Sequence, residues 1–172
     1  MNFIELSKAR YSVRNFDQRP IESEKLQTIL EAGRLAPTAT NAQPQRIFVL
    51  QSPEMLEKIR SATRMAFNAP VVLMVCYDKT VSWKATRFGE DYDAGEMDAS
   101  IVTTAMMMQA AELGIGSLWA RGFNGPEIAA AFDLPENLHL VCLLDLGYPA
   151  ADSQPSERHD SRLPLEETVK TL

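Results

Sequence analysis

The chain has 172 residues, of which 45% are hydrophobic, and its formal net charge is −6. This size fits one globular domain with a substantial core. The negative charge argues against a general electrostatic attraction to nucleic acid or to an anionic membrane surface. No apolar run approaches the roughly 20 residues needed to span a bilayer, and the start MNFIELSKAR lacks the apolar stretch of a secretory signal. We therefore expect a cytoplasmic protein that binds neither nucleic acid nor membranes.

The first elements predicted along the chain are two helices. Residues 3–9 form a short helix that leads into the extended segment ARYSVRNF. Apolar residues recur with the helical period over residues 21–35, where Ser23 can cap the start and Pro37 stops the run. The loop PTATNAQPQ follows.

The middle of the chain alternates predicted strands and helices. Ser52 is placed to cap a helix that has Pro53 at its first position. The apolar run APVVLMVCY has the length of a strand that is buried on both faces. The predicted elements are a strand over 46–51, a helix over 52–62 and a strand over 69–77.

The second half begins with a polar and aromatic segment, residues 78–91, which we interpret as a lid or arm. The longest predicted helix, residues 93–113, is rich in Ala and Met, and its apolar residues extend around most of the circumference, which predicts burial on all sides. The remaining predicted elements are a strand within 114–121, a short helix over 124–132 capped by Asn124, a strand over 138–149 and a polar tail over 150–172.

These elements predict an α+β fold. Helices and strands are mixed without regular βαβ spacing, which favours a three-layer domain with a predominantly antiparallel sheet flanked by helices. No internal repeat or Gly/Ser linker divides the chain, so residues 1–172 are expected to form a single domain. Cys76 and Cys142 lie inside apolar strand segments and are interpreted as buried thiols of the core rather than a disulfide or a reactive pair.

The sequence carries no catalytic constellation of its own. Its two histidines, His139 and His159, form no metal-ligand spacing with another His or Cys. The motifs of serine hydrolases, of P-loop nucleotide sites and of Rossmann dinucleotide sites are all missing. We therefore expect no metal and name no catalytic residue. Such a chain either binds without reacting or borrows its chemistry from a cofactor.

The segment ARYSVRNF is a candidate anion site. In extended backbone, successive side chains point to opposite faces, so Arg10, Ser12 and Arg14 share one side while Tyr11 and Val13 share the other. Guanidinium groups form bidentate, charge-assisted bonds with phosphate. The alternative is that the arginines are solvated surface charges.

Five strings in order, RYSVRNF, APTATNAQPQRIFVL, GIGSLWARGF, LLDLGYP and SRLPLEETV, resemble the FMN-dependent nitroreductase family over nearly the whole chain. The resemblance implies a dimeric three-layer fold, FMN as cofactor and NADH or NADPH as electron donor. It also implies that Arg10, Ser12 and Arg14 contact the FMN phosphate and ribityl chain. Arg162 is similar to a C-terminal arginine of the family that holds the phosphate, usually from a tail supplied across the dimer.

Further residues follow from the same resemblance. Asn41 is expected beside the polar edge of the flavin ring, and Arg64 near its pyrimidine end, with Arg60 as the competing candidate and a surface arginine as the alternative. The backbone of Arg121 and Gly122 is expected to meet the flavin nitrogen that accepts hydride.

The chain departs from the family at two positions. Gln45 stands where tryptophan is frequent, so we expect different local packing, and Asp160 stands where many relatives have lysine, so we expect weaker phosphate binding.

The function implied by the resemblance is reduction of nitroaromatics, quinones or similar flat electron acceptors by a ping-pong mechanism. Relatives that dehalogenate, oxidise azolines or cleave flavin are alternatives. A flavin-storage or flavin-sensing module, and a hydrolase or ligand-binding domain without flavin, remain open as other classes.

Overall fold

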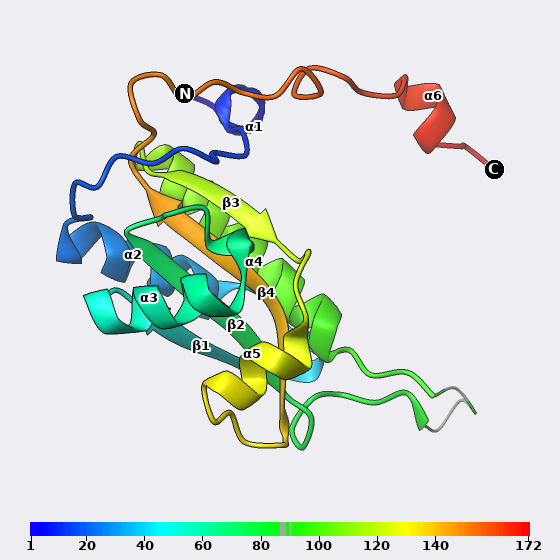
Figure 1. The fold of residues 1–172 in the computed structure, drawn as a ribbon. Helices are drawn as coiled ribbons and strands as arrows, with labels where there is room; N and C mark the ends of the chain where they lie inside the picture. The colour runs from blue at the N-terminus through cyan, green and yellow to red at the C-terminus, as the bar shows by residue number, and fades with distance from the viewer. Residues whose placement is uncertain (87–88, 90) are drawn as a thin grey trace.

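A four-stranded antiparallel sheet forms the middle layer of the molecule (Figure 1). The computed structural model describes residues 1–86, 89 and 91–172. The strands are β1 (Gln45–Leu50), β2 (Val71–Asp78), β3 (Gly116–Ala120) and β4 (Leu138–Gly147), in the spatial order β1-β2-β4-β3. The helices are α1 (Phe3–Ala9), α2 (Ser23–Leu35), α3 (Pro53–Ala62), α4 (Gly95–Glu112), α5 (Gly125–Ala131) and α6 (Leu165–Thr168), with short 3-10 turns η1 (Ala39–Asn41) and η2 (Arg64–Ala66).

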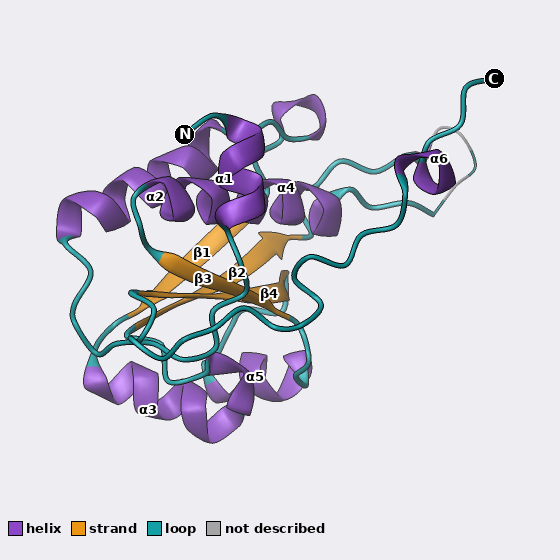
Figure 2. Ribbon diagram, turned by 90° about the horizontal axis from the view of Figure 1, so that it is seen from above, coloured by secondary structure: helices purple, strands orange, loops and turns teal. Residues whose placement is uncertain are grey.

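Helices cover both faces of the sheet (Figure 2). On one face Ile59 of α3 and Ile128 of α5 are fully buried, and on the other face Ile29 of α2 and Met106 of α4 are fully buried. All eight residues of β2 are buried, as expected for a central strand between two layers. Each fully buried aliphatic side chain contributes about 1.5–3 kcal/mol relative to exposure. The predicted three-layer α+β fold with an antiparallel sheet is confirmed.

The helix starts agree with the sequence at two of three places. Ser52 caps α3 by accepting a hydrogen bond from the backbone N–H of Met55, and Asn124 caps α5. The prediction for α2 is wrong, because Ser23 is the first helical residue and Glu22 occupies the cap position without a side-chain cap. Glu22 instead accepts a hydrogen bond from the Tyr148 hydroxyl, which fixes the start of α2 from outside the helix.

Helix α4 is buried on one face only. Val102 and Met106 point into the core, but Met97 is 56% exposed and Ile101 is 38% exposed. The sequence predicted burial on all sides; the sheet and α2 cover only the side of the helix that faces them. An apolar surface therefore remains open on this chain.

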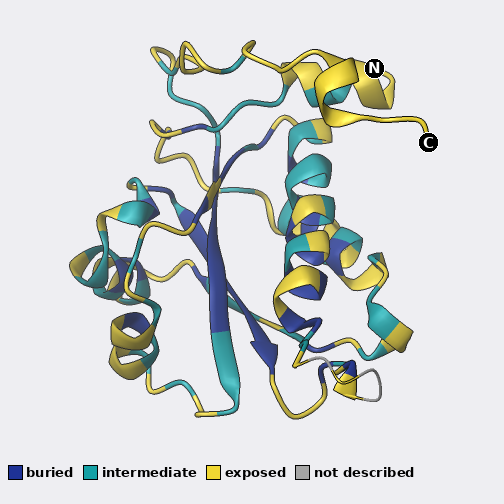
Figure 3. Ribbon diagram, turned by 90° about the vertical axis from the view of Figure 1, so that its right-hand side faces the viewer, coloured by how far each residue is buried: buried dark blue, intermediate teal, exposed yellow. Residues whose placement is uncertain are grey.

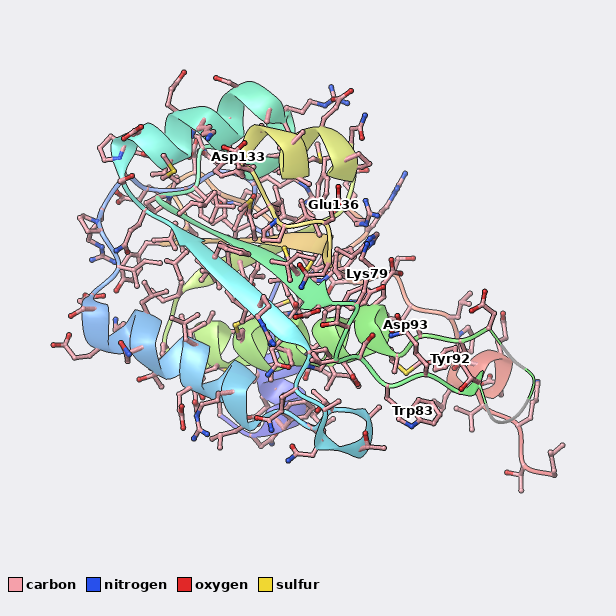
Figure 4. The ribbon with its side chains drawn as sticks, turned by 90° about the horizontal axis from the view of Figure 1, so that it is seen from below. Lys79, Trp83, Tyr92, Asp93, Asp133 and Glu136 are labelled. Carbon is pink, nitrogen blue, oxygen red and sulfur yellow. The ribbon has the colours of Figure 1, made fainter. Side chains whose placement is uncertain are left out.

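Two segments project from the three layers. The arm predicted over residues 78–91 has a paired stem, in which the Ala85 N–H donates to the Tyr92 carbonyl and the Ala94 N–H donates to the Trp83 carbonyl. The rings of Trp83 and Tyr92 meet edge-on, with centroids 6.3 Å apart (Figure 4). Residues 87, 88 and 90 of the predicted arm lie outside the described residues. The end of the tail, including α6, extends away from the core and is exposed (Figure 3).

The core also encloses titratable groups. Cys76 and Cys142 are buried and free, as expected, and burial raises the pKa of Cys76 to about 12. Asp145, near the end of β4, is fully buried, and neither carboxylate oxygen has a hydrogen-bond partner among the described residues. Burial raises the pKa of Asp145 to about 8, although the charge of Arg60 acts in the opposite direction. This carboxyl group therefore favours its neutral form near neutral pH.

Candidate functional site

The segment that carries Arg10, Ser12 and Arg14 lies along the outer edge of the sheet. Ser12 forms a parallel bridge with Ser117 of β3, and the Val13 N–H donates to the Ser117 carbonyl at 3.0 Å. Val13 is 1% exposed, so it anchors the segment to the core. Arg10, Ser12 and Arg14 line one pocket, as the alternation predicts, but Tyr11, which was expected on the side of Val13, lines it as well.

The tail closes the other side of this pocket. The backbone N–H of Ala150 donates to the Asn15 carbonyl at 3.0 Å, and the Tyr11 hydroxyl donates to Ser153 Oγ at 3.2 Å. His159 Nε2 lies 2.9 Å from the Lys8 carbonyl oxygen. These contacts bring the residues near 159 back to the first helix of the same chain.

Four arginines line the pocket, whose volume is about 150 Å³. Arg162 is held there by hydrogen bonds from Nη1 to the carbonyls of His159, at 2.6 Å, and Ser161, at 2.7 Å. The residues that line it are Arg10, Tyr11, Ser12, Arg14, Ser156, Arg158, His159 and Arg162. We call this set the cationic pocket. None of these described lining residues is acidic.

The electrostatics of the cationic pocket are unbalanced. Burial lowers the pKa of the Arg10 guanidinium, and the nearby charge of Arg162 lowers it further. A bound anion would relieve this repulsion, and guanidinium groups suit phosphate oxygens. Asp160, the acidic departure noted in the sequence, has a side chain that is 98% exposed and does not line the pocket. The donor set therefore fits a phosphate group.

Asn41 lies at the opposite end of the sheet. Gln45, a few residues later, pairs with Tyr77 at the end of β2, whereas Ser12 pairs with Ser117 beside the end of β4.

The long helix gives a second measure of this separation. The loop that contains Asn41 contacts Asp98 near the start of α4, while Arg10 lines a second pocket together with Ala111 near its end. The helical rise puts Asp98 and Ala111 about 20 Å apart along the axis. One chain therefore presents Asn41 and the cationic pocket at separate places.

Gly122 lies beside Met65, the residue that follows Arg64 in η2. A Cβ atom on Gly122 would come within 3.2 Å of Met65 Sδ, so η2 packs against the segment after β3. Arg64 is exposed on η2. Its competitor Arg60 is turned inward and donates from Nη2 to the Ala69 carbonyl at 3.0 Å. This geometry favours Arg64 as the cation available to a ligand.

The Arg121 guanidinium is directed toward the Phe123 ring, 5.2 Å from its centroid. The side chain of Arg121 thus contacts the Phe123 ring. This agrees with the expectation that the backbone of residues 121–122, and not the guanidinium, makes the functional contact. Gln45 begins β1, and its Oε1 is buried without a hydrogen-bond partner among the described residues.

Sequence reasoning missed part of the cationic pocket. Arg158 and His159 line it, and the signal was present, because SERHDSR places three basic side chains within five residues. Within the described part of the chain, no group of His, Cys, Asp and Glu side chains is arranged to hold a metal ion. No helix found there is long and apolar enough to cross a membrane.

Comparison with known proteins identifies the family. The model of the nitroreductase family matches residues 8–67 and 60–148. A crystal structure of a nitroreductase family protein from Clostridium difficile superposes with a TM-score of 0.92 at 42% identity, covering 100% of both chains. A protein of Archaeoglobus fulgidus with NAD(P)H nitroreductase in its name is 33% identical over 158 residues, which are 88% of this chain and 87% of that protein. The FMN reductase [NAD(P)H] of Bacillus subtilis is 27% identical over 164 residues, 86% of this chain and 66% of that protein. The chain therefore belongs to the nitroreductase family.

Proposed function

We propose that the protein is a cytoplasmic, FMN-dependent homodimer that uses NADH or NADPH to reduce nitroaromatics, quinones or similar flat electron acceptors. As a member of its family, the chain is an NAD(P)H-dependent oxidoreductase. The observation that carries the cofactor assignment is the cationic pocket, where Arg10, Arg14 and Arg162 converge with no acidic side chain among the described lining residues.

The cationic pocket would hold the phosphate of FMN. A phosphate monoester carries close to two negative charges, and each hydrogen bond from a guanidinium contributes about 1.5–3 kcal/mol. Arg10, Arg14 and Arg162 supply the charge, and the Ser12 hydroxyl can donate to a phosphate or ribityl oxygen. This assignment explains why cations gather on a chain whose net charge is negative.

Other residues would face the ring of the cofactor. Arg64 provides a cation that favours negative charge on the ring, and the backbone of Arg121 and Gly122 provides a fixed N–H donor. Asn41 can both donate and accept at a polar ring edge. When bound, FMN supplies hydride chemistry that no side chain of this protein offers. Donor and acceptor would use the same place in turn, which gives ping-pong kinetics.

A second copy of the chain would complete the site. One chain keeps Asn41 and the cationic pocket at opposite ends of the sheet, so one cofactor reaches both only if the loop comes from a partner. The exposed apolar residues Met97 and Ile101 on α4 offer a surface for such a partner. A two-fold axis would then create two equivalent sites.

The experiment is a visible spectrum of the purified protein with added FMN, followed by NADH or NADPH. We expect bound yellow flavin that bleaches with a nicotinamide nucleotide and regains colour when a nitroaromatic or quinone is added. Light scattering should give the mass of a dimer. Product analysis then separates this activity from dehalogenation, azoline oxidation and flavin cleavage.

Three results would contradict the proposal. A protein that stays colourless after FMN is added would be a hydrolase or ligand-binding domain without flavin. Bound FMN that neither nucleotide bleaches would indicate a storage or sensing module. A monomeric mass with FMN bound would exclude the shared site.

A further inference from the structure

The loop between α2 and β1 has an unusual backbone. Thr40, Asn41 and Gln43 have positive φ values of 51°, 59° and 49°. Residues other than glycine rarely adopt this region, and each such residue costs of order 1–3 kcal/mol unless its surroundings fix it. Some contact must therefore hold the loop that presents Asn41.

The loop holds part of its shape through its own hydrogen bonds. The Gln43 N–H donates to Thr38 Oγ1 at 3.0 Å, and the Asn41 N–H donates to the Thr38 carbonyl at 3.0 Å. These bonds fix the turn internally. They do not set where the loop lies relative to the rest of the molecule.

Asp98 of α4 provides that external contact. Its Oδ1 accepts a hydrogen bond from the Ala39 N–H at 2.9 Å, and the residue is 2% exposed. Its Oδ2 is buried and has no hydrogen-bond partner among the described residues. The carboxylate also lies in the first turn of α4, where the helix dipole favours negative charge. A carboxylate so enclosed makes a stronger hydrogen bond than an exposed one.

We infer that Asp98 is a positioning residue that fixes the loop presenting Asn41 to the flavin ring. The inference rests on the proposed function, because it assigns the loop a ligand. Without the Asp98 acceptor, the Ala39 N–H loses its partner, and the three residues with positive φ can relax. Asn41 then no longer occupies one place, while the cationic pocket at the other end of the sheet is unaffected.

Variants can remove either the acceptor or the donor of this hydrogen bond. Asp98→Ala removes the acceptor. Asp98→Asn keeps an oxygen for the Ala39 N–H but removes the negative charge, so it should restore part of what Asp98→Ala loses. Ala39→Pro removes the donor without changing Asp98, and it is compatible with the fold because residue 39 begins η1 and Thr38 is extended, with φ −132° and ψ 157°. Thr103→Val, in a buried position on the same helix, is the matched control.

The readouts are amide exchange at Ala39 and the Kd values of FMN and riboflavin, which lacks the phosphate. For Asp98→Ala we expect faster exchange and an approximately tenfold weaker Kd for both flavins, the loss of about 1.4 kcal/mol. Ala39→Pro should weaken both flavins to the same extent, and the double variant should show no further loss. Asp98→Asn should lose less affinity than Asp98→Ala, and Thr103→Val should remain within about twofold of the parent protein.

Two results would overturn the inference. One is parental Kd values in Asp98→Ala and Ala39→Pro, which would show that the loop has no part in flavin binding. The other is an equal loss in Asp98→Asn, which would show that charge rather than the hydrogen bond matters. A parent protein that binds neither flavin contradicts the proposed function and with it the ligand assigned to this loop. If the parent protein binds both flavins and only the Kd values of the variants depart from expectation, the role of Asp98 alone is contradicted.

Discussion

The two ends of the sheet are held in different ways. At the cationic pocket, the N-terminal segment and the tail meet through polar contacts near the surface, such as Tyr11 with Ser153 and His159 with Lys8. At the other end, the loop carrying Asn41 is fixed to a buried carboxylate. The first end brings like charges together, whereas the second stores backbone strain.

The two ends are expected to respond differently to a ligand. Guanidinium groups that repel one another gain stability when an anion binds, so the cationic pocket should become more ordered with its ligand. The loop is already shaped without one. We therefore expect ligand binding to change order at the cationic pocket far more than at the Asn41 loop.

The largest effect on stability is expected from Asp145, which is buried in the core. Asp145 has a folded pKa near 8, above its ordinary value near 4, so the folded state keeps a proton that the unfolded state loses. Folding stability should thus fall as the pH rises from about 4 to about 8. Asp145→Asn should raise the free energy of unfolding at pH 8 by up to about several kcal/mol, and with it Tm. It should have little effect at pH 4.

Thermal unfolding across this pH range checks the expectation. An equal gain at both pH values would show that the Asp145 carboxyl is charged throughout. Because Asp145 lines neither end, its replacement should leave the Kd of FMN unchanged. A large change in that Kd would mean that the core and the two ends are coupled.

The next largest effect is expected from removing the end of the tail. Truncation before Asp160 deletes Arg162 and α6, and we expect loss of FMN and a lower Tm, because a ligand that binds only the folded dimer stabilises it. Truncation after Arg162 is the control, since it deletes α6 and retains the arginine. Arg162→Ala should act in the same direction but more mildly. If the protein truncated before Asp160 keeps full FMN affinity and reduces a nitroaromatic at the parental rate, the N-terminal segment alone binds the phosphate.

A smaller effect is expected from single arginines of the N-terminal segment. Arg10→Ala and Arg14→Ala should each weaken FMN binding by about one to two decades, the loss of a charge-assisted contact of roughly 1.5–3 kcal/mol. Riboflavin binding should change little, in contrast to the loop variants. Arg34→Ala is the control, because Arg34 is exposed and paired with Glu31 on α2. Unchanged FMN affinity in both variants would mean that the arginines are surface charges.

The smallest effect is expected from the strained loop. Thr40→Gly places glycine at a φ of 51°, a conformation that glycine adopts without cost. Stability should therefore change by less than about 1 kcal/mol, since relief of strain is offset by greater freedom of the unfolded chain. Calorimetry of the parent and the variant measures the difference. A strong destabilisation would show that the threonine side chain, and not the backbone, fixes the loop.

Much of the fold and part of the candidate site could be predicted from local patterns. Alternation in ARYSVRNF correctly put Val13 on the side away from Arg10 and Arg14, and the continuous apolar run identified β2 as a strand buried on both faces. Both follow from periodicity and burial, which are properties of neighbouring residues. The association of Arg162 with Arg10 came from resemblance, since nothing local links two residues so far apart in sequence.

The remaining features depend on contacts across the fold. Ser23 looked like a cap, but Tyr148 binds Glu22 and fixes the start of α2 instead. No prediction was made for Asp98, because its role depends on a contact with Ala39, 59 residues away in the sequence. The positive φ values of Thr40 and Asn41 could not be predicted from the sequence either, since neither residue is a glycine.

The distance between Asn41 and the cationic pocket has a consequence for mixtures of defective proteins. If each site combines the pocket of one protomer with the loop of the other, a dimer of one Arg10→Ala protomer and one Asp98→Ala protomer concentrates both defects in one site. Its second site is intact. Two impaired variants should therefore complement each other after joint refolding, with about one quarter of all sites regaining parental FMN affinity if subunits assort at random. Sites built within one chain would show no such recovery.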